Sequence, residues 1–182
     1  SPHTLQPGFG KGTRILRDQA RGMDDRHLFA AGEEPPPRSA GHETTFACDV
    51  KDAVSLRSTI WLLADRVARR LRHHGFLAQT VGVRFKVGRK RFSRQHALVS
   101  PTDDSRRITL TAWRLLEGAR RGRALRLVGV AAMRLVQVER EPMLFPEDQK
   151  RLAITHIGDR LRDRFGEDAI LPAGVFLGKE SE

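Results

Sequence analysis

The sequence contains very little of several residue types, and each shortage excludes a class of protein. Cys48 is the only cysteine in 182 residues, so no intrachain disulfide and no cysteine-based metal site can form. There is no Tyr, and Trp occurs only twice. No stretch is apolar enough to span a bilayer, and the first residues contain no apolar signal segment. We therefore expect a cytoplasmic protein that makes no membrane contact.

Acidic residues are missing from one long stretch, Arg66–Thr102, which holds ten Lys or Arg residues. Six of these cations fall within eleven residues: Arg84, Lys86, Arg89, Lys90, Arg91 and Arg94. The whole chain has 33 Lys and Arg against 22 Asp and Glu, a formal net charge of +11. A surface of one charge sign attracts polyanions, and this composition favours phosphate-rich nucleic acid as the partner.

Composition divides the chain into four segments. Residues 1–30 contain one short helical pattern, and residues 31–38 form a Pro-rich linker. Residues 39–138 form the main domain, and residues 139–182 form a tail with a further amphipathic helix at 148–165. The carboxylate pair Asp103-Asp104 suits a helix start better than a metal site, because no third ligand is evident. We predict no catalytic residue and no metal site.

The apolar spacing of the main domain predicts an α+β fold with the order β-α-β-β-α-β. We expect two helices, at 50–74 and 108–118, and four strands, at 39–48, 76–87, 91–99 and 125–138. Right-handed crossovers would place both helices on one face of a four-stranded sheet. The other face of the sheet would then be open.

Strand parity assigns the basic residues to that open face. Val83 and Phe85 alternate with Arg84 and Lys86, which is the pattern of a half-buried strand. The next strand is less regular, because strict alternation puts Phe92 and Arg94 on one face. This indicates either a bulge there or an error in the expected register.

Three motifs follow one another along the chain: Phe9-Gly10-Lys11-Gly12, Ala20-Arg21-Gly22-Met23-Asp24 and Ser39-Ala40-Gly41-His42-Glu43-Thr44-Thr45-Phe46. Together they resemble the C-terminal region of Y-family translesion DNA polymerases of the bacterial polymerase IV type. The first two are similar to the end of the family's thumb, and the third is similar to the strand that opens its little finger domain. By this resemblance 1–30 would be a thumb remnant, 39–138 the little finger and the whole a monomer that grips duplex DNA.

The resemblance also implies which residues face the DNA backbone. Matched position by position, these are His42, Thr44, Arg84, Lys86, Ser93 and Arg94, and Arg91 adds a further cation beside them. The catalytic palm of the family, with its magnesium-binding carboxylates, is not matched by any part of this chain. We therefore expect no cofactor in this chain and no nucleotidyl transfer by it alone.

Two motifs lie beyond the domain. Met143-Leu144-Phe145 falls where family members carry a peptide for the sliding clamp, and Leu144 and Phe145 match that peptide. Asp159, Arg162, Arg164, Phe165 and Gly166 resemble the tail pattern DxIRxRFG of some bacterial members.

Three other functions share some of these features. An RNA-recognition module has the same element order, but it needs aromatic side chains on the open sheet, and only Phe92 could serve. A protein-interaction module would act through Met143–Phe145. A catalytically inactive polymerase homologue, acting as a mutagenesis adaptor, would have the same C-terminal region.

Overall fold

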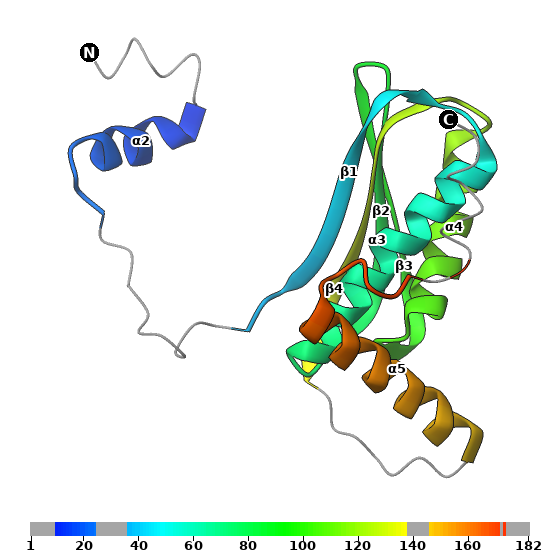
Figure 1. Cartoon of the computed structure of the whole chain (residues 1–182). Coiled ribbons are helices and arrows are strands. Elements are labelled where there is room, and N and C mark those ends of the chain that lie inside the picture. The colour runs from blue at the N-terminus through cyan, green and yellow to red at the C-terminus, as the bar shows by residue number, and fades with distance from the viewer. Residues whose placement is uncertain (1–9, 25–35, 138–145, 172, 174–182) are drawn as a thin grey trace. The chain divides into compact units, whose positions relative to one another are not determined.

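The structure, a computed structural model, describes residues 10–24, 36–137, 146–171 and 173 (Figure 1). The chain divides into two compact units, Ser1–Pro36 and Pro37–Glu182, and this division falls inside the predicted linker 31–38. In the first unit a 3₁₀ turn, η1 (Gly10–Gly12), leads into the helix α2 (Thr13–Ala20). The hydroxyl of Thr13 donates to the Gly10 carbonyl at 2.9 Å and so closes the turn.

The second unit has the predicted order β-α-β-β-α-β followed by a C-terminal helix. Its elements are β1 (Ser39–Val50), α3 (Ala53–His73), β2 (Phe76–Val87), β3 (Lys90–Thr102), α4 (Ser105–Arg120), β4 (Leu125–Gln137) and α5 (Pro146–Phe165). The predicted α+β class is therefore confirmed. The hairpin turn between β2 and β3 is shorter than predicted, because pairing already begins at Lys90.

The four strands form one antiparallel sheet in the order β1-β4-β2-β3. The connection from β1 through α3 to β2 crosses β4, and the connection from β3 through α4 to β4 crosses β2. Both helices lie on the same side of the sheet (Figure 1), as the handedness of such crossovers requires. Neither α3 nor α4 covers the other face of the sheet.

The core fills the space between the sheet and the two helices. Leu56, Ile60 and Leu71 of α3 and Ile108 and Leu116 of α4 are fully buried there. From the sheet come alternate residues of the central strands, namely Val81, Val83, Phe85, Val128, Val130 and Ala132. These helices form mainly because packing stabilises their apolar sides, since most helical stability in proteins comes from tertiary contacts.

Carboxylates cap both helices. Asp52 accepts a hydrogen bond from the Ser55 backbone N–H at 2.6 Å, and Asp104 accepts one from the Arg106 N–H at 2.9 Å. Each carboxylate satisfies a donor that a helix start leaves unpaired. The predicted helix start at Asp103-Asp104 is thus confirmed, and it positions α4 against the β3 edge. Among the described residues no helix has the length and apolarity needed to cross a membrane.

Candidate nucleic-acid interface

The pairing of β2 with β3 brings four of the predicted binding residues to one side of the sheet. Arg84 lies opposite Ser93, and Lys86 lies opposite Arg91. Directly opposed residues of an antiparallel pair point to the same face. Because Phe85, between the two cations of β2, is fully buried under the helices, these four side chains point the other way. We call this uncovered side the open face.

Gly82, Gly129 and Ala131 lie at the centre of the open face, and the Met133 side chain reaches over Gly82, where its Cε would be 2.6 Å from an added Cβ atom. Gly82 and Arg84 lie opposite Ala131 and Gly129 of β4, and Gly129 lies opposite Glu43 of β1. A Cβ atom at Gly129 would come within 2.8 Å of the Glu43 Cβ, so a larger residue would not fit there without a shift. Glycine inside a strand often marks a place where a ligand backbone approaches the sheet closely. A strand of nucleic acid can therefore come near the sheet at its middle, beside the cations.

One acidic side chain shares the open face with the cations. The Glu43 carboxylate lies 3.5 Å from the Arg84 guanidinium, and the two side chains are 50% and 61% exposed. An exposed ion pair of this length contributes at most about 1 kcal/mol to stability. A phosphate approaching Arg84 would therefore meet a partly compensated charge. The sequence analysis did not single out Glu43, although the strand parity of β1 would have placed it two residues from Gly41 and Thr45 on one face.

Three other predicted residues lie on the opposite side of the sheet, facing the helices. His42 and Thr44 are paired with Val130 and Val128, which are core residues of β4. Arg94 is paired with Val83 of β2. Their placement on the open face was therefore wrong, as was the alternative of a bulge at Phe92 and Arg94. The pairing runs without interruption from Val87 to Thr80 of β2, and the register shift lies nearer the other end, between Thr80 and Ala78.

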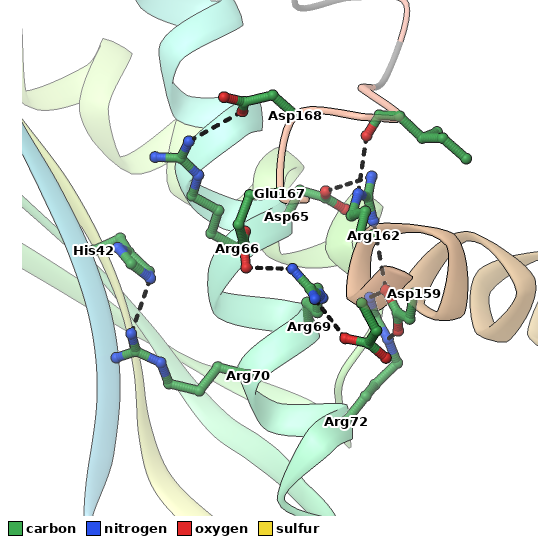
Figure 2. A network of polar contacts seen from close by, with 12 residues as sticks. His42, Asp65, Arg66, Arg69, Arg70, Arg72, Asp159, Arg162, Glu167 and Asp168 are labelled. Atoms are coloured by element: carbon green, nitrogen blue, oxygen red, sulfur yellow. Dashed lines mark hydrogen bonds and ion pairs between the residues drawn. The ribbon is translucent and has the colours of Figure 1, made fainter. Parts of the chain in front are cut away.

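His42 instead contacts helix α3. Its Nε2 lies 3.1 Å from a guanidinium nitrogen of Arg70 (Figure 2). Burial lowers the pKa of His42 below its ordinary value of 6.5, and the nearby charges of Arg70 and Arg66 lower it further. The ring is thus held as the neutral form, which suits a hydrogen-bond acceptor and not a phosphate contact.

Three arginines of α3 form ion pairs with acidic residues of the C-terminal segment, as Figure 2 shows. Arg72 makes two hydrogen bonds to Asp159, at 2.6 and 2.9 Å. Arg69 pairs with Glu167 and, at 2.6 Å, with Asp163. The other contacts of this network are Arg66 with Asp168 at 3.4 Å and Arg162 with Asp65 at 3.0 Å.

This network shows where the arginines in the first part of the acid-free stretch Arg66–Thr102 find their acidic partners. The carboxylates that pair with Arg66, Arg69 and Arg72 come from a segment about ninety residues later in the chain. Asp159, Asp163 and Glu167 recur every four residues, which places them on one helix face or its continuation. That spacing was visible in the sequence, but it could not show which cations these acids would meet. By contrast, Glu43 is the only acid among the described residues that forms an ion pair with a cation of the open face.

The predicted clamp peptide, Met143-Leu144-Phe145, lies outside the residues that the structure describes, so it stays a prediction. In the predicted tail motif, Arg162 has a clear structural role. It is 9% exposed, pairs with Asp65 and Asp159, and donates to the Ile170 carbonyl at 2.9 Å.

Comparison with known proteins gives one family match and a consistent set of relatives. The family model described as the impB/mucB/samB family C-terminal domain matches residues 37–143. A DNA polymerase IV of Desulfatibacillum aliphaticivorans is 32% identical over 180 residues, which is 94% of this chain and 44% of that protein. A DNA polymerase IV of Moorella thermoacetica is also 32% identical, over 93% of this chain and 43% of its own length.

One solved structure, described as "Complex of beta-clamp processivity factor and little finger domain of PolIV", matches with a TM-score of 0.47 and 27% identity. It covers 58% of this chain and 97% of that chain. The chain spans less than half the length of the two curated relatives named above.

Proposed function

The chain belongs to the impB/mucB/samB family, as the C-terminal region that holds the little finger domain of Y-family polymerases, and we propose that its open face binds duplex DNA. The observation that carries this proposal is the register of the β2–β3 hairpin. It gathers Arg84, Lys86, Arg91 and Ser93 on the open face, beside Gly129 of the neighbouring strand. The Arg, Lys and Ser side chains gathered here are suited to hydrogen bonds with phosphate oxygens. Such contacts position a protein on DNA and carry no sequence information.

The charge and its arrangement predict binding that depends steeply on salt. Each cation that neutralises a phosphate releases condensed counterions, with a slope of about 0.9 in log affinity against log salt for duplex DNA. Arg84, Lys86 and Arg91 would thus contribute a slope of about 2.7 together. The ion pair with Glu43 lowers the contribution of Arg84 to this slope. The three cations together should therefore contribute a slope between about 1.8 and 2.7.

The test is the affinity for a labelled 20-base-pair duplex at several salt concentrations. The triple variant Arg84→Gln, Lys86→Gln and Arg91→Gln should lose most of the salt slope, similarly for unrelated sequences. The matched control removes three exposed helix arginines, as Arg57→Gln, Arg106→Gln and Arg107→Gln, and should keep nearly all of it. Equal losses in the two variants would mean that only net charge matters, and the proposal would be wrong.

The strand register does not support the binding of single strands by base stacking on the sheet. Phe92, the aromatic residue on which that reading depends, lies opposite Phe85 on the helix side, and the two rings stack at 5.3 Å. From Thr80 to Lys86 of β2, and among the residues paired with this stretch, no open-face residue is aromatic. We therefore expect duplex to compete better than single strand of equal length for the open face.

A sliding clamp is the partner proposed for Met143-Leu144-Phe145. The proposal rests on the match of Leu144 and Phe145 to the clamp-binding peptide of the family. Replacing both with Ala should abolish capture of the chain by an immobilised sliding clamp and leave duplex binding unchanged. Capture that persists in the double variant would remove the motif from consideration.

A further inference from the structure

A basic pocket lies on the helix side of the sheet, where the C-terminal end of α4 meets the edge strand β3. It has a volume of about 620 Å³. Its lining is made of four arginines and of apolar or small residues, namely Arg94, Arg114, Arg121, Arg123, Phe92, Leu115, Gly118 and Ala119. We call it the arginine pocket. It contains no acidic residue in its lining, and no part of the proposed function uses it.

Some arginines of the described domain form an ion pair with a carboxylate, and the four arginines of the pocket are among those that do not. Arg66, Arg69, Arg72, Arg84, Arg120 and Arg162 each form an ion pair. Over the residues that the structure describes, no ion pair joins Arg94, Arg114, Arg121 or Arg123 to an acid. Like charges around one hollow repel one another, and an anion inside it would turn that repulsion into attraction.

Helix geometry accounts for two of these arginines and not for the other two. Arg121 and Arg123 follow the end of α4, where the negative end of the helix dipole favours cations. Arg123 also donates to the carbonyls of Arg120 and Ala119, and its guanidinium stacks on the Phe92 ring with 5.1 Å to the centroid. Arg94 comes from β3 and Arg114 from the middle of α4, so neither is a helix-end residue. Their convergence on the same hollow needs another explanation.

The pocket and the open face lie on the two sides of the same edge strand, β3. β3 is an outer strand of the sheet, so nothing pairs with its far side in the described sheet. Arg91 points to the open face and Arg94, three residues further, to the helix side. At about 3.3 Å per residue these two cations are only about 10 Å apart along the strand. Cations therefore line both sides of one sheet edge.

The stiffness of nucleic acids decides what could follow such a path. Duplex DNA has a persistence length of about 50 nm, so it cannot turn around the edge of a single sheet. A single strand is flexible, and basic grooves with an aromatic or guanidinium plane are how proteins hold its backbone and bases. We infer that the arginine pocket binds the phosphates of a single-stranded extension that leaves the duplex on the open face and passes around β3. This inference deepens the proposed function and rests on it for the position of the duplex.

The experiment compares a blunt 16-base-pair duplex with the same duplex carrying a twelve-nucleotide single-stranded overhang. The gain in affinity from the overhang is measured as a function of salt for the parent and for Arg94→Gln/Arg114→Gln. Two lost phosphate contacts should lower the salt slope of this gain by about 1.4, at about 0.7 per single-strand contact. The blunt duplex should bind both proteins alike. The control Arg106→Gln/Arg107→Gln removes two exposed arginines from the first turn of the same helix and should keep the full gain.

The outcomes separate this inference from the proposed function. If the blunt duplex fails to bind the parent, the proposed function is wrong. The pocket is then tested by measuring the affinity of a free single strand for the Arg84→Gln/Lys86→Gln/Arg91→Gln variant. An overhang gain that survives Arg94→Gln/Arg114→Gln unchanged would overturn the inference. So would equal displacement of the overhang by inorganic phosphate or by polyglutamate, which would show a site for anions in general. Because the side chains of Arg94 and Arg114 are exposed, the double variant should have the same midpoint of thermal unfolding as the parent. This midpoint is measured alongside.

Discussion

The substitution Glu43→Gln should strengthen duplex binding, which is the opposite of what most changes in a binding site do. Glu43 is the acid that the register places on the open face beside Arg84, at 3.5 Å. Replacing its carboxylate with an amide keeps the shape of the side chain and removes one negative charge. Arg84 would then be free to neutralise a phosphate completely.

The size of this effect follows from the geometry. A phosphate hydrogen-bonded to Arg84 on its far side would lie about 6.5 Å from the Glu43 carboxylate, given a contact of about 2.9 Å. Their repulsion is about 2.6 kcal/mol for an effective dielectric constant of about 20 and about 0.6 kcal/mol for water. Screening at about 0.1 M salt halves both values, since the Debye length there is about 10 Å. The expected gain in affinity therefore lies between about twofold and about tenfold.

The assay is duplex affinity as a function of salt, with Glu147→Gln as the control. Glu147 is an exposed residue of α5, so this control makes the same change in net charge away from the sheet. Glu43→Gln should bind more tightly than the control and show a steeper salt dependence, by up to about 0.9 in slope. Equal affinities for the two variants would refute the placement of DNA on the open face. Weaker binding by Glu43→Gln would refute it more strongly.

Three further predictions concern the structure behind the open face. Arg162→Met leaves the buried Asp65 without its 3.0 Å partner, which should make α5 more sensitive to limited proteolysis and lower the free energy of unfolding by up to about 3 kcal/mol. Because the pKa of His42 is lowered on folding, the unfolded chain takes up its proton first; stability should fall as the pH drops below 6.5, and His42→Gln should lose that part of the pH dependence in urea titrations. Phe85→Ala removes a fully buried ring and should cost about 3–5 kcal/mol, seen as a lower midpoint of thermal unfolding; no change in that midpoint would contradict its place in the core.

The sequence allowed good prediction where one face of an element is marked by apolar residues. In β2, Val81, Val83 and Phe85 mark the core side, so Arg84 and Lys86 had to point away from it. The strand β1 is marked more weakly: Ala40 and Phe46 lie on the core side, but the polar residues His42 and Thr44 stand between them. Its assignment therefore rested on family resemblance, and for His42 and Thr44 it came out on the wrong side.

The strand β3 shows why even a marked strand can be misread. Phe92 and Arg94 have the same parity, so they share a face, and the aromatic ring decides which one. A bulge between them would have freed Arg94 to join the open face. The uninterrupted pairing with β2 excludes that bulge, and only the structure contains this information.

The sequence by itself determined the order of strands and helices, the core side of the central strands and the excess of positive charge, because these depend on local spacing and composition. Tertiary structure decided which distant groups meet. It paired the arginines of α3 with acids some ninety residues later, placed Glu43 beside Arg84, and moved Arg94 to the side of Arg114. Such contacts depend on strand register and on the packing of separate elements. A slip of one residue in a strand would move its side chains to the other face of the sheet without any change in composition.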